Sequence, residues 1–111
     1  MATTTNIPVA ITPEATARIA ALGIQREVDE MLEHTRQTIG DLESIEIETW
    51  DDEYEPGHAH LTIIGWRSAP TSGEEMARLV EGWVHWFVRT FPPDVLRWFG
   101  FEVLSRDEHG R

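Results

Sequence analysis

Two histidines on one predicted strand are the clearest candidate for chemistry. His58 and His60 are one residue apart, and side chains at i and i+2 of an extended strand project from the same face. Imidazoles at this spacing can chelate one metal ion, and carboxylates of the preceding turn suit the same ions. The metal hypothesis therefore names four ligands: His58, His60, Asp52 and Glu55. In the simpler interpretation, which we favour, these histidines are ordinary strand residues and the protein has no cofactor. A bound divalent metal is the alternative.

Aromatic side chains are the second candidate, because seven rings fall between residues 83 and 101. A bulky core would account for many of them. The alternative is that some rings form a subunit interface or a groove for an apolar ligand. The residues singled out for these roles are Trp50, Trp66, Trp83 and Trp86, and Phe87 joins Trp66 and Trp83 in the predicted ligand groove. A homodimer through the open sheet face or the second long helix would bury such rings.

Enzymatic motifs are not found in the sequence. There is no nucleophile elbow, P-loop, dinucleotide fingerprint, zincin helix or deaminase signature. The remaining histidines, His34, His85 and His109, are interpreted as surface residues. No catalytic residue is assigned, and a non-enzymatic role is favoured over an enzyme.

The charge is large and unevenly distributed. The chain has 20 Asp and Glu against 9 Arg and no Lys, which gives a formal charge of -11. Residues 27–55 hold twelve acids and Arg36, so that segment alone sums to -11, while the remainder balances eight acids with eight Arg. Such a field repels nucleic acid and anionic membranes. It favours a basic surface on a partner protein.

The chain has no Cys, which excludes disulfides, thiol chemistry and Cys-based metal sites. Its N-terminus shows neither a basic region nor an apolar run, so we expect no signal peptide. No apolar stretch approaches the ~20 residues that span a bilayer. We expect a soluble, cytoplasmic protein.

The first half of the chain predicts one helical region and a hairpin. Residues 1–11 are expected to be extended or frayed, and Thr12 followed by Pro13 is a helix start signal. Helical spacing continues to Gly40 as the C-cap, and Gly23 either leaves this helix whole or divides it. Strands are predicted at 44–50 and 58–67, joined by a turn with Pro56-Gly57, as an antiparallel hairpin.

The second half predicts a long helix and one further strand. Thr71 or Ser72 is expected to cap a helix that ends before Pro92-Pro93. Residues 94–99 could form a helical turn followed by a strand at 101–105, or residues 95–104 could all be strand. The tail, 106–111, is expected to be loose.

These elements predict an α+β fold of order α-β-β-α-β in a single domain over residues 12–105. A two-layer arrangement, with an antiparallel sheet and both helices on one face, would bury the apolar positions. The leading functional hypothesis is a small acidic interaction or regulatory module that forms a homodimer and meets a basic partner surface. The alternatives are a divalent-metal protein, hydrolytic or not, and a small apolar-ligand domain.

Overall fold

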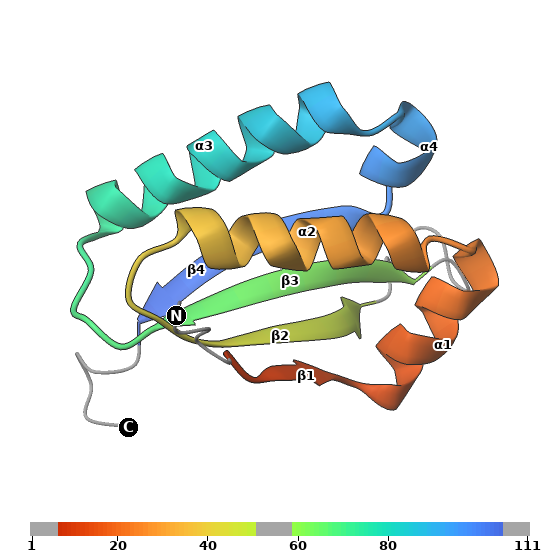
Figure 1. The fold of residues 1–111 in the computed structure, drawn as a ribbon, viewed down its shortest axis with the longest axis horizontal. Helices are drawn as coiled ribbons and strands as arrows, with labels where there is room; N and C mark the ends of the chain where they lie inside the picture. The colour runs from red at the N-terminus through yellow and green to blue at the C-terminus, as the bar shows by residue number, and fades with distance from the viewer. Residues whose placement is uncertain (1–6, 51–58, 106–111) are drawn as a thin grey trace, which may run out of the picture.

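The computed structural model describes residues 7–50 and 59–105, and these contain four strands and four helices. The strands are β1 (Val9–Ile11), β2 (Leu42–Trp50), β3 (His60–Arg67) and β4 (Phe99–Ser105), and the helices are α1 (Pro13–Leu22), α2 (Gln25–Thr38), α3 (Gly73–Thr90) and α4 (Pro93–Leu96). The strands form one sheet in the order β1-β2-β3-β4 (Figure 1). The predicted α+β class is confirmed.

The sheet is mixed, although the sequence predicted an antiparallel one. β2 and β3 pair antiparallel, as the predicted hairpin requires, but β1 lies parallel to β2 and β4 lies parallel to β3. In each parallel pair a helical connection carries the chain back to the starting end of the sheet, as parallel neighbours require. The prediction missed β1 because three residues are too few to show strand alternation.

The helix starts follow the predicted capping residues. The Ala15 N–H donates to Thr12 Oγ1 at 3.1 Å, and Pro13 takes the first helical position of α1. The Glu75 N–H donates to Ser72 Oγ at 3.1 Å, so Ser72 rather than Thr71 caps α3. Each hydroxyl satisfies a backbone donor that has no partner within its helix.

The helix ends resolve the alternatives that the sequence left open. Gly23 has φ 68°, a left-handed conformation that favours glycine, and it ends α1, so the predicted long helix is divided. α2 ends at Thr38 with Ile39 as its C-cap, earlier than the predicted cap at Gly40. After Pro92, the short α4 precedes β4, which is the helical-turn alternative.

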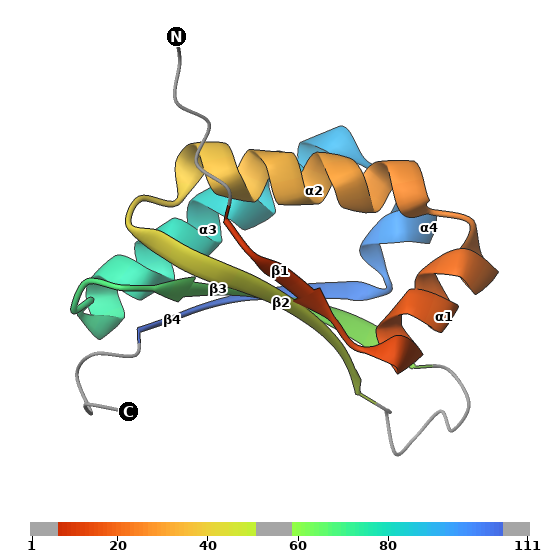
Figure 2. The ribbon, with the colours of Figure 1, turned by 60° about the horizontal axis from the view of Figure 1, so that its bottom comes forward.

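α2 and α3 pack side by side on one face of the sheet, and no described helix covers the other face (Figure 2). The strand residues that meet the helices are Ile45, Ile47, Leu61, Ile63, Phe101 and Val103, all buried. From the helices, Val28, Met31, Trp83 and Phe87 are among the residues that join this core. Among the described residues, no helix combines the length and apolar character needed to cross a membrane.

Candidate functional site

The uncovered face of the sheet is formed by even-numbered residues of its three longer strands, except at the start of β2, where the register shifts after Leu42 and Leu42 packs against the core. Their odd-numbered neighbours point into the core, so strand alternation turns these side chains away from the helices. We call this surface the acidic sheet face. It comprises Glu46, Glu48, Trp50, His60, Thr62, Ile64, Trp66, Gly100, Glu102 and Leu104.

Strand register places two carboxylates on either side of an apolar centre. Glu46 lies opposite Ile64 on β3, and Ile64 lies opposite Glu102 on β4. Because neighbouring strands are about 4.8 Å apart, the two acidic residues are separated by roughly 10 Å across Ile64. Glu46 and Glu102, which are distant in the sequence, therefore lie on either side of Ile64 in the middle of the sheet.

A hollow of about 480 Å³ lies on this face, and Glu48 and Glu102 both contribute to its lining. The other lining residues are Trp50, Thr62, Ile64, Gly100 and Phe101. Gly100 contributes no side chain, and a Cβ built there would meet only Thr62 Oγ1, at 4.0 Å. We call this space the sheet hollow. Its lining combines carboxylates with an exposed aromatic ring, an arrangement suited to a cationic group.

Trp50 provides the exposed aromatic surface at one end of the acidic sheet face. Its side chain is 50% exposed. Its ring stacks on His60 with centroids 4.6 Å apart, and His60 also contacts Trp98 at 5.6 Å. Trp66, at the other end of β3, is half-buried. Two of the four predicted interface tryptophans therefore share this face.

The predicted metal ligands are only partly described. His58, Asp52 and Glu55 lie outside the described residues, and the imidazole of His60 stacks on Trp50 and makes a tilted contact with Trp98. His60 Nε2 is buried and has no hydrogen-bond partner among the described residues. Residues 7–50 and 59–105 contain no group of three His, Asp or Glu that could hold a metal. The metal hypothesis stays a prediction.

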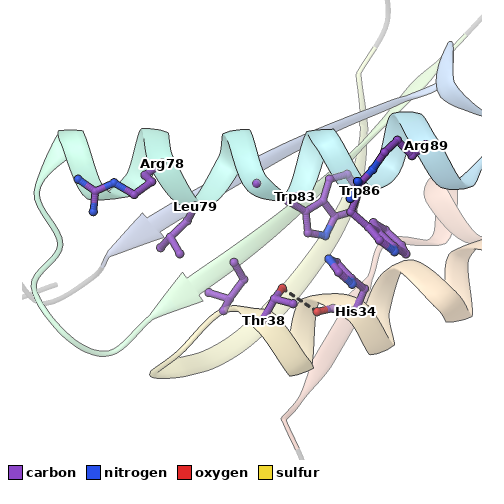
Figure 3. Close-up of a pocket in the computed structure, with 9 residues that line it drawn as sticks. His34, Thr38, Arg78, Leu79, Trp83, Trp86 and Arg89 are labelled. Carbon is purple, nitrogen blue, oxygen red and sulfur yellow. Dashed lines mark hydrogen bonds between the residues drawn. The ribbon is translucent and has the colours of Figure 1, made fainter.

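The other two tryptophans line a separate hollow of about 320 Å³ between α2 and α3, which we call the helix hollow (Figure 3). Its lining is His34, Thr38, Ile39, Arg78, Leu79, Gly82, Trp83, Trp86 and Arg89. Trp83 is 2% exposed and belongs mainly to the core, where its Nε1–H donates to Thr35 Oγ1 at 2.9 Å. Trp66 and Phe87, predicted to share a ligand groove with Trp83, do not line this space.

His34 is a residue that sequence reasoning missed. It was predicted to be an ordinary surface residue, but it is half-buried, and its ring stacks on Trp86 with centroids 3.7 Å apart and planes 4° apart. Burial lowers the pKa of the His34 imidazole below 6.5, because desolvation disfavours the charged form. No pattern in the sequence indicates this contact, because His34 lies on α2 and Trp86 on α3, and the two rings meet only when the helices pack together.

The acidic segment predicted from the sequence is distributed over α2 and β2. Residues 51–55, the end of that segment, lie outside the described residues. From His60 to Ser105 the chain holds five acids and four Arg, so the half that contains α3 and β4 is nearly neutral. Comparison of the chain with protein-family models, with curated proteins and with solved structures found no match.

Proposed function

We propose that this protein is a non-enzymatic interaction module whose acidic sheet face binds a basic segment of a partner protein. The observation that carries the proposal is the sheet hollow, which opens on a face that no described helix covers. Two carboxylates and one half-exposed indole line it. A hollow with this lining accepts the head of an arginine or lysine side chain.

The chemistry of recognition follows from the lining residues. A guanidinium in the sheet hollow could be paired by Glu48 or Glu102 while its flat face lies on Trp50. A cation over an indole is worth about 0.5–2 kcal/mol, depending on desolvation. The formal charge of -11 would steer a basic partner toward the molecule at low ionic strength.

The sheet hollow is tested with a fluorescent arginine-rich peptide in an anisotropy titration. We expect Glu48→Gln/Glu102→Gln to weaken binding about ten-fold or more, since charge-assisted hydrogen bonds contribute roughly 1.5–3 kcal/mol each. Gly100→Val should weaken binding by filling the hollow, and its β-branched side chain suits a strand.

The matched control removes the same two charges elsewhere. Glu27→Gln/Glu30→Gln lies on α2, which packs on the opposite face of the sheet. If the control weakens peptide binding as much as Glu48→Gln/Glu102→Gln does, the interaction depends on net charge and the site proposal is wrong. Unchanged binding by Gly100→Val would also contradict it.

In this proposal the module is a homodimer whose two copies meet along β4. Among the described strands, β4 pairs only with β3, so its outer edge is open, whereas the opposite edge strand β1 has three residues. β4 contains one charged residue, Glu102, and neither Lys nor Pro, so it lacks the usual protection of an open edge. The nearly neutral half of the chain forms this side, which keeps the acidic halves of two copies apart.

An apolar flank of α3 extends the proposed dimer surface. Val84 and Val88 are 37% and 55% exposed and are one helical turn apart. With about 100° of rotation per residue, they lie on the side of α3 opposite Gly82 and Arg89, which face the helix hollow beside α2. Antiparallel pairing of two β4 strands would bring this flank against its copy.

Sedimentation velocity tests the dimer. We expect the native chain to sediment as a dimer at a protein concentration of tens of micromolar, which corresponds to an association free energy of about 6–7 kcal/mol. The variant Val84→Glu/Val88→Glu should sediment as a monomer, because dimerisation would bury its added charges. The control Ala20→Glu/Ala21→Glu adds the same charge to exposed positions of α1 and should leave the dimer intact. A native monomer at this concentration would contradict the proposal.

A further inference from the structure

A glycine in the middle of a helix lines the helix hollow. Gly82 lies inside α3, and a glycine within a helix destabilises it by about 0.5–1 kcal/mol relative to alanine. Its φ is not positive, and a Cβ built at this position would meet nothing within 4 Å. Neither backbone strain nor crowding requires the glycine. Its structural effect is to leave the helix hollow open.

The walls of the helix hollow are apolar and aromatic. Leu79, Ile39 and Trp83 line it, and the stacked rings of His34 and Trp86 bridge the two helices at the end near Arg89 (Figure 3). The volume of about 320 Å³ falls at the small end of the range for ligand pockets, roughly 300–1,000 Å³. Flat rings favour a flat, apolar ligand, because aromatic pairs prefer stacked or edge-to-face contacts.

The charged residues at the helix hollow are both basic, although the chain as a whole is strongly acidic. Arg78 contacts Glu74 at 3.9 Å, and both side chains are largely exposed, at 70% and 87%, so this ion pair is weak. Arg89 has no ion pair among the described residues. Its guanidinium is therefore available to an anion, and it matches the two oxygens of a carboxylate.

We propose that the helix hollow binds a small aromatic carboxylate, with its ring against Trp86, Trp83 and Leu79 and its carboxylate on Arg89. A basic ligand is disfavoured by the two Arg. A neutral apolar ligand leaves Arg89 without a counter-charge. The site is distinct from the sheet hollow, since the two share no lining residue and lie on opposite faces of the sheet.

The test compares the binding of 2-naphthoate with that of its neutral analogue, 2-naphthamide. Calorimetry measures the affinity, and NMR spectra follow the backbone and indole N–H signals of the protein. We expect 2-naphthoate to bind with a Kd below about 1 mM, a modest affinity for a pocket of this size, and to shift the signals of Gly82 and Trp86. The amide should bind about ten-fold more weakly, as should 2-naphthoate to Arg89→Gln, because each change removes the ion pair.

Gly82→Leu should abolish binding by filling the helix hollow, and leucine is a better helix former than glycine. The matched control Gly73→Leu makes the same change at the start of α3, where a Cβ also meets nothing within 4 Å, and it should bind normally. Equal binding of acid and amide, binding retained by Gly82→Leu, or no shift at all would overturn the proposal. Tighter binding of a peptide with a C-terminal phenylalanine carboxylate would assign the site to a chain terminus instead of a free acid.

Discussion

Replacing Trp83 with alanine is expected to lower the free energy of unfolding by about 3–5 kcal/mol, the range for truncation of a large buried aromatic side chain. The indole is 2% exposed and stacks on Phe101 with ring centroids 4.2 Å apart. It also contacts Phe87 at 4.9 Å. Its removal would leave a cavity where α2, α3 and β4 meet. Chemical denaturation followed by far-ultraviolet circular dichroism measures the loss.

A double-mutant cycle separates the hydrogen bond of Trp83 from its packing. Thr35 Oγ1 accepts from Trp83 Nε1–H at 2.9 Å and donates to the Met31 carbonyl at 2.7 Å. Thr35→Val keeps the shape but leaves the indole N–H without this acceptor, at a cost of about 1–3 kcal/mol. In a Trp83→Phe background the same change should cost less, because phenylalanine has no N–H. Equal costs in both backgrounds would contradict this role for Thr35.

Replacing Arg67 with methionine is expected to lower the free energy of unfolding by about 3 kcal/mol, because the Gly40 carbonyl and the buried Thr71 hydroxyl lose the guanidinium that donates to them. Arg67 is 7% exposed, its Nε donates to the Gly40 carbonyl at 2.8 Å, and Nη1 donates to Thr71 Oγ1 at 2.8 Å. These bonds join the turn before β2 to the loop before α3. Asp41 and Glu75 lie 3.4 and 3.5 Å from its nitrogens, but their side chains are 61% and 46% exposed, so they contribute less.

Urea unfolding of three variants checks the role of Arg67. Arg67→Lys should recover only part of the loss, since an ammonium cannot reproduce the fork of a guanidinium. Arg26→Met, at an exposed arginine of α2, should change the stability by less than about 0.5 kcal/mol. A loss below about 1 kcal/mol for Arg67→Met would mean that water replaces the guanidinium at the Gly40 carbonyl.

Sequence reasoning was accurate where a few neighbouring residues control the structure. Thr12 and Pro13 start α1 as predicted, because a cap depends on hydrogen bonds within one turn. The alternation around Ile45 and Ile47 identified the buried face of β2 and the hairpin with β3. The acidic sheet face follows from the same alternation, so Trp50 and Trp66 could be assigned to a face opposite the core.

Contacts between distant segments could not be predicted in this way. β1 pairs with β2 through Val9 and Ile45, and the alternation of a three-residue strand is too short to indicate a partner. The burial of Arg67 could not be predicted either, because its Nε bonds to the Gly40 carbonyl, which comes from the turn before β2. The same applies to His34 and Trp86, which stack across two helices.

By itself the sequence determined the α+β class, the caps, the hairpin and the position of the acidic segment, since each depends on periodicity, local hydrogen bonds or composition. The tertiary structure decided the mixed sheet, the separation of Trp83 in the core from Trp50 on the open face, and both hollows. The physical reason is that periodicity determines which side chains share a face, whereas packing determines which faces meet. Gly100 and Gly82 leave space only where residues from other elements surround them.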